Sequence, residues 1–243
     1  MTATWATSVR VLSQLRRDPR TIVLIVGVPC LLETLLQQLF RGRPEVFQHV
    51  GAPLLGLFPF VSMFVVTSVT MLRERTSGTL ERLMTMPLAK LNVLGGYAGA
   101  FALLAVVQAT VVSLLAFGVL GLDVAGPQWA VVALAVANAT LGMALGLFLS
   151  AFATTEFQAV QFMPAIVLPQ FLLCGLFVAR SDMAEWLRVV SALLPLTYAY
   201  DALAKVAKGG PYGARLALDV AVILGSVVLA LALGAATLKR RTD

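Results

Sequence analysis

Few side chains in this sequence lie where they could do chemistry, and Glu33 is the first of them. It lies in a long apolar stretch, four residues before Gln37, so the two side chains share one face of a helix. A carboxylate within a membrane span costs roughly 3 kcal/mol or more, which makes Glu33 a candidate for handling substrate, a proton or an ion. The alternative is that Glu33 is paired or hydrated near the end of its helix and handles no substrate.

Other catalytic patterns are absent from the sequence. It contains no G-x-x-x-x-G-K-[ST] phosphate loop, no H-E-x-x-H motif and no cysteine–histidine cluster suited to a metal. Cys30 and Cys174 both lie in apolar runs, where packing is the usual role. We therefore expect no enzyme activity, no catalytic residue and no metal or cofactor in this chain. Energy for any transport must come from another polypeptide.

The composition is that of an integral membrane protein. Of the 243 residues, 59% are hydrophobic and 12% are charged, against about 25% charged in soluble domains. The net charge of +6 does not indicate nucleic acid, because the cations cluster beside apolar runs, as they do at an anionic membrane face. The expected surroundings are the lipid bilayer.

We expect one all-α transmembrane domain covering residues 1–243. A spanning helix needs roughly 20 apolar residues, and an amphipathic pattern over residues 4–18 predicts an interfacial helix before the first span. The six predicted spans are residues 21–40, 53–72, 94–120, 129–152, 158–179 and 216–238.

Two features of these spans could serve packing or function. Pro164 and Pro169, accompanied by Gln161 and Gln170, should bend the fifth span, which would then line a translocation path or bend only for packing. The G-x-x-x-G pairs at residues 95 and 99 and at residues 142 and 146 allow close helix packing, either within the chain or at a dimer face.

A charged segment, Leu72–Leu88, separates the second and third apolar runs. From Thr79 its apolar and polar residues alternate with helical spacing, and Pro87 ends the pattern. The segment predicts a short amphipathic helix at the membrane surface, suited to contact with a soluble partner.

This segment resembles ABC-2 type transporter permeases, the membrane subunits of ABC exporters such as drug-resistance and polysaccharide-export systems. The residues that match the pattern E-x-x-x-G-T-L-E…P are Glu74, Gly78, Thr79, Leu80, Glu81 and Pro87. The resemblance implies that residues 73–88, Arg82 included, form a coupling helix that contacts a separate ATPase subunit carrying ATP and Mg. It also implies a second permease copy or a sister permease.

A second block, Leu168–Leu203, resembles the family's re-entrant hairpin at the outer face, here residues 180–208. The residues that we assign to this hairpin are Gly175, Glu185, Trp186, Pro195, Tyr198 and Asp201. Within it, Asp201 precedes Lys205 by four residues, a spacing that favours an ion pair along one helix.

The distribution of basic residues predicts the orientation. With six spans, eleven Lys and Arg residues fall on the side of the termini and seven on the other. This bias favours both termini in the cytoplasm, and it places Leu72–Leu88 on the side where ATP is.

Our hypothesis is an ATP-driven exporter permease in a bacterial cytoplasmic membrane. It would move an amphipathic drug, lipid or natural product, as in drug efflux and antibiotic resistance. Export of a polysaccharide or glycolipid remains open. A second hypothesis is a channel or ion-coupled carrier that uses Glu33 without an ATPase, and a third is an assembly factor with no transport.

Overall fold

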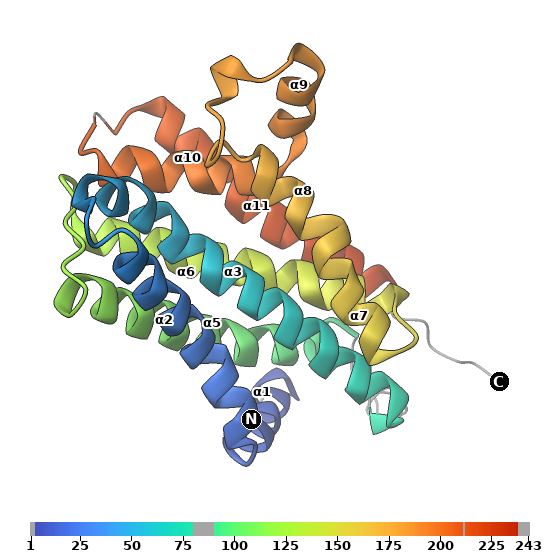
Figure 1. Cartoon of the computed structure of the whole chain (residues 1–243). Coiled ribbons are helices and arrows are strands. Elements are labelled where there is room, and N and C mark those ends of the chain that lie inside the picture. Colours follow the sequence, from blue (N-terminus) through green and yellow to red (C-terminus); the bar gives the residue numbers. More distant parts are fainter. Residues whose placement is uncertain (1–2, 80–89, 211, 238–243) are drawn as a thin grey trace.

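A computed structural model describes residues 3–79, 90–210 and 212–237 (Figure 1). The described segments are helical, and five helices are long and apolar enough to cross a membrane: α2, α3, α5, α6 and α11. This confirms the predicted all-α membrane fold. The α-helices are α1 (Ala3–Arg16), α2 (Pro19–Leu39), α3 (Pro44–Thr76), α5 (Lys90–Gly118), α6 (Gln128–Leu149), α7 (Glu156–Phe162), α8 (Leu168–Leu173), α9 (Glu185–Leu193), α10 (Pro195–Ala207) and α11 (Ala214–Thr237).

The centre of the bundle is the pair α3 and α6, which are the most buried of the long helices. Gly142 and Gly146 of α6 lie against the backbone of α3. A Cβ atom on Gly142 would be only 2.1 Å from the carbonyl oxygen of Phe60, and one on Gly146 only 2.4 Å from that of Phe64. The Thr67 hydroxyl of α3 also lies 3.2 Å from the Met143 carbonyl oxygen of α6. This glycine pair therefore serves close packing within the chain.

The helix α3 is longer than the predicted span 53–72. It begins at Pro44, whose fixed φ suits a first helical turn, and it continues through Pro53 and Pro59. Its last turn includes Arg73, Glu74 and Arg75, which the sequence placed in a separate coupling helix. The prolines do not end the helix because α6 and α10 pack along it and hold it in place.

The predicted fifth span, residues 158–179, is not a single helix. The α-helix α7 is followed by a π-helical segment, Met163–Val167, and then by α8, which ends at Leu173. Pro164 and Pro169 lack the N–H groups that a regular α-helix needs. Gly175 then takes φ +107°, a conformation that ends the helix and that side-chain-bearing residues rarely adopt. Eighteen helical residues at 1.5 Å each still rise about 27 Å, close to the bilayer core.

We call the two ends of the helix bundle the α1 end and the hairpin end. At the α1 end lie α1, the last turn of α3 and the first turn of α7, since Arg10 pairs with Glu74 and Arg73 with Glu156. At the hairpin end lie α9, α10 and the α5–α6 loop, whose Ala125 N–H donates to the carbonyl of residue 207. In Figure 1, α1 and the hairpin helices α9 and α10 lie at opposite ends of the long helices.

Candidate functional site

Three side chains from three helices meet at the α1 end: Arg10 of α1, Glu74 of α3 and Tyr97 of α5. The Tyr97 hydroxyl donates to Glu74 Oε2 at 2.7 Å, and the Arg10 guanidinium lies 3.3 Å from the same oxygen. Arg10 also donates to the Tyr97 hydroxyl, and its guanidinium carbon lies 5.6 Å from the centre of the Tyr97 ring. Charge-assisted hydrogen bonds of this kind are roughly twice as strong as neutral ones. The last turn of α3 is therefore tied to α1 and α5.

The interfacial helix α1 packs closely on the start of α5. The Ser8 hydroxyl donates to the Gly96 carbonyl at 2.8 Å. A Cβ on Gly96 would lie 2.5 Å from the Thr7 Cβ and 2.9 Å from the Thr4 carbonyl oxygen, so only glycine allows this approach. Sequence analysis missed Ser8, Gly96 and Tyr97. The small residues at 95, 96 and 99 were the available signal.

The chain leaves α3 through a turn in which Gly78 has φ +71°. The hydroxyls of Ser77 and Thr79 lie 2.9 Å apart in this turn. A hollow of about 260 Å³ lies between this turn and α1, and its lining includes Gln14, Glu74 and Thr79. The remaining predicted coupling residues Leu80, Glu81, Arg82 and Pro87, and with them the predicted amphipathic helix, lie outside the described residues.

A bidentate ion pair joins the last turn of α3 to the broken helix, by which we mean α7, the π-helical segment and α8 together. Arg73 Nε and Nη2 lie 2.7 and 2.9 Å from the two carboxylate oxygens of Glu156, the first residue of α7. The hydrogen bonds from Arg73 lower the pKa of Glu156 below its usual value near 4.5. Thr155 caps α7 by accepting from the Gln158 N–H at 3.2 Å. The end of α3 is thus in direct contact with the first turn of α7.

Glu33 is completely buried within the chain, and neither of its carboxylate oxygens has a hydrogen-bond partner in the described structure. The side-chain oxygen of Gln37, one turn further along α2, has none either. The neighbouring Thr34 hydroxyl donates along the same helix to the Cys30 carbonyl at 2.7 Å. The polar contacts of α2 with other helices lie about two turns nearer the α1 end. There Gln108 Nε2 donates to the Ile25 carbonyl at 2.6 Å, and Ser62 donates to it at 3.3 Å. No partner for Glu33 is therefore found among the described residues, and the alternative in which its carboxylate is hydrated stays a prediction.

The four residues of the broken helix that we predicted to line a translocation path differ in exposure. Gln161, Pro164 and Pro169 are exposed, whereas Gln170 is buried and its amide donates to the Ile166 carbonyl at 3.2 Å. Beside them lies an apolar groove of about 430 Å³ between α2, α3 and the broken helix. Its lining includes Leu32, Phe58, Val61, Val167, Leu168 and Phe171. Sequence analysis missed these residues, because an apolar groove residue has the same pattern as any span residue.

At the hairpin end, α9 and α10 form a helix pair bent by 89°. Pro195 is the first residue of α10, and Gly175 precedes the hairpin at φ +107°. Ser191 ties the pair to α8, since its hydroxyl donates to the Leu173 carbonyl at 2.8 Å. Tyr198 of α10 donates to the Ala192 carbonyl of α9 at 2.8 Å.

Asp201 and Lys205 do not form a direct ion pair, although the positive charge of Lys205 still acts on the Asp201 carboxylate. Asp201 binds Arg180, with 3.3 Å between Oδ2 and Nη1, and Lys205 binds Asp219 of α11. Both α10 side chains therefore bind residues outside α10, because Arg180 and Asp219 approach this helix from other parts of the chain. The predicted hairpin residues Glu185 and Trp186 are both exposed on α9.

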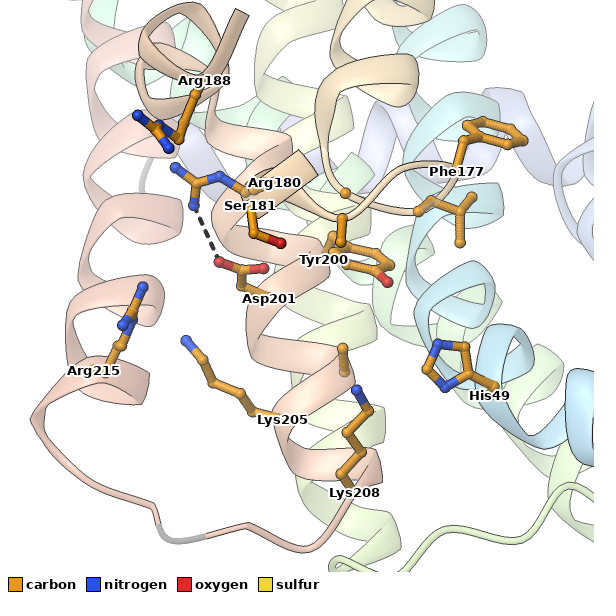
Figure 2. A pocket seen from close by; sticks show the side chains of 14 residues that line it. His49, Phe177, Arg180, Ser181, Arg188, Tyr200, Asp201, Lys205, Lys208 and Arg215 are labelled. Atoms are coloured by element: carbon orange, nitrogen blue, oxygen red, sulfur yellow. Dashed lines mark hydrogen bonds and ion pairs between the residues drawn. The ribbon is translucent and has the colours of Figure 1, made fainter. Parts of the chain in front are cut away.

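A pocket of about 710 Å³ opens at the hairpin end (Figure 2). Basic side chains from the loop before α9, from α9, from α10 and from α11 surround it, together with His49 of α3. Its wall on the apolar side includes Leu176, Phe177 and Tyr200. No group of three His, Cys, Asp or Glu side chains suited to a metal occurs among the residues that the structure describes.

The chain belongs to the ABC-2 type transporter family, whose model matches residues 2–207. It is 27% identical over 173 residues to ABC transporter G family member 20 of Dictyostelium discoideum, covering 71% of this chain and 24% of that protein. It is 25% identical over 169 residues to YbhR of Escherichia coli K12, described as a probable multidrug ABC transporter permease, covering 70% of this chain and 46% of that protein. The matched region thus spans less than half of either relative. Family membership and the apolar helices identify a multi-pass membrane protein.

Proposed function

We propose that this chain is the permease subunit of an ATP-driven exporter and moves an amphipathic drug, lipid or natural product. A separate ATPase subunit would bind ATP and Mg and would press on residues 73–88. The functional unit would contain two permeases, identical or sister chains, in a bacterial cytoplasmic membrane with both termini in the cytoplasm. The permease itself would catalyse no reaction.

The observation that carries this proposal is the continuity of α3. This helix runs without a break from the hairpin end to Thr76, directly before the family's G-T-L-E segment. Its last turn is joined to α1 and α5 through Glu74 and to α7 through Arg73. A push on the segment after Thr76 would therefore move α3 and the broken helix together, and these elements line the apolar groove.

The groove supports an apolar or amphipathic substrate. Its lining is almost entirely aliphatic and aromatic, and Ser62 is its one polar side chain. Ligand sites of this kind obtain most of their affinity from apolar contact. The Escherichia coli relative is described as a probable multidrug ABC transporter permease, which agrees with such a substrate. Export of a sugar polymer, with no drug movement in the same vesicles, would reject this substrate class.

The test is ATP-driven efflux from vesicles containing the permease and a candidate ABC ATPase subunit. We expect Glu81→Arg to abolish efflux and co-purification of the ATPase, because it reverses a charge in the proposed contact. The matched control is Glu45→Arg, which makes the same change on an exposed carboxylate at the hairpin end of α3. Efflux that survives Glu81→Arg, or a purified permease that transports without any ATPase, would contradict the proposal.

Glu33 favours a second candidate, an ion-coupled carrier. Its carboxylate is buried without a hydrogen-bond partner in the described structure. An ionisable side chain inside a membrane span is by default a candidate proton or ion site. In that case Glu33→Gln would abolish transport and Glu81→Arg would be harmless. The exporter proposal predicts the reverse order of sensitivity.

A further inference from the structure

The pocket at the hairpin end has a large excess of positive charge. Among the described residues, five Lys and Arg side chains line it, and Asp201 is the one carboxylate that does. The basic residues are Arg180, Arg188, Lys205, Lys208 and Arg215. Asp201 neutralises Arg180, and Asp219 of α11 neutralises Lys205. Three positive charges therefore remain without a counter-ion in the described part of the chain.

The unneutralised cations come from three different elements. Arg188 is on α9, Lys208 follows α10, and Arg215 is in the first turn of α11 (Figure 2). In addition, Arg180 Nε is buried and has no hydrogen-bond partner, although its Nη1 binds Asp201. Guanidinium groups present paired donors that match the oxygens of a phosphate. The pocket thus has both the charge and the donors for a phosphate.

The surroundings of the pocket are apolar. Phe177, in the pocket wall, is 62% exposed, and on α9 the side chains of Trp186 and Leu193 are 67% and 79% exposed. An amphipathic helix with exposed large apolar side chains lies in a membrane interface. A phosphate held by the basic residues would therefore have acyl chains beside it, on surfaces already turned toward lipid.

We propose that the hairpin pocket binds the phosphate group of an anionic lipid from the leaflet at the hairpin end. A volume of about 710 Å³ suits a lipid headgroup, since pockets for small ligands measure roughly 300–1,000 Å³. A zwitterionic headgroup should bind more weakly, because its ammonium adds a positive charge to a pocket that already has an excess of them. This proposal rests on the proposed function in one respect only: with both termini in the cytoplasm, the hairpin end faces the outer leaflet.

The test uses the full chain in detergent and measures thermal stabilisation by three probes. These are short-chain phosphatidylglycerol, short-chain phosphatidylcholine and inorganic phosphate. We expect phosphatidylglycerol to stabilise the protein at low salt, with much weaker effects of the other two. Arg188→Gln with Arg215→Gln should raise the dissociation constant for phosphatidylglycerol by roughly 25-fold, since each basic residue near an anionic lipid contributes about fivefold.

Both substituted residues lack an ion-pair partner in the described structure, so the folded state should survive their replacement. The control is Arg41→Gln with Arg43→Gln, two exposed arginines at the same end of the bundle and outside the pocket. Unchanged phosphatidylglycerol binding by the pocket variant, or equal stabilisation by phosphatidylcholine, would overturn the proposal. Inorganic phosphate acting as strongly as phosphatidylglycerol would overturn the lipid source. None of these measurements involves ATP or transport, so failure of the exporter proposal would not affect them.

Discussion

Replacing Gly142 by alanine should separate the two central helices. The new Cβ would lie 2.1 Å from the Phe60 carbonyl oxygen and 2.8 Å from its carbonyl carbon, both backbone atoms that no rotamer change can move. A carbon and a carbonyl oxygen normally approach to about 3.3 Å, so α3 and α6 must move apart by roughly 1.2 Å. Overpacking of this kind costs about 1–3 kcal/mol. Alanine recovers about 0.5–1 kcal/mol through its better helix propensity.

We therefore expect a net loss of up to about 2.5 kcal/mol, and a loss of about 1–3 kcal/mol relative to an alanine placed where it meets no neighbour, measured by unfolding the purified protein with SDS in mixed micelles. The control is Gly225→Ala on α11, where a Cβ would meet no atom within 4 Å. That variant should be neutral or slightly more stable. If Gly142→Ala proved as stable as Gly225→Ala, the close approach of α3 and α6 at Phe60 would be refuted.

Three further predictions concern single polar groups. Tyr97→Phe keeps the ring but removes the hydroxyl bound to Glu74, so it should cost about 1–3 kcal/mol in the same SDS titration; an unchanged midpoint would argue against the three-helix contact. Glu156→Gln should cost at most about 1 kcal/mol at pH 7, since the pair with Arg73 is exposed. Because the folded pKa of Glu156 is lowered, this stabilisation is present above pH 4.5 and disappears as the pH falls through the folded value, and a difference that persists in acid would contradict the assignment. Glu33→Gln should leave stability unchanged or raise it, since no hydrogen bond is lost, and a large destabilisation would reveal a partner for the carboxylate.

The sequence predicts the helical membrane fold well because long apolar runs have few other structural solutions. It predicts close helix packing at Gly142 and Gly146, but only the structure shows that the packing partner is α3 of the same chain. Periodicity did not locate the ends of helices, and α3 runs through Pro53 and Pro59 because neighbouring helices hold it.

Partners across the fold were not predictable. The sequence pairs Asp201 with Lys205 because only local spacing is visible, whereas the fold supplies Arg180 and Asp219 from 21 and 14 residues away. Tyr97 looked like an ordinary apolar residue until α1 and α3 brought Arg10 and Glu74 to its hydroxyl. The basic pocket likewise exists only after four elements converge.

The attachment of α1 to α5 has a consequence for biosynthesis. Ser8 and Arg10 bond to residues 88 and 87 positions later in the chain. At translation rates of 5–20 residues per second, these partners emerge roughly 4–18 seconds after α1 itself. The contact of α1 with α3 through Arg10 and Glu74 can therefore form first, and the contacts of α1 with α5 form only after this third long helix has been inserted.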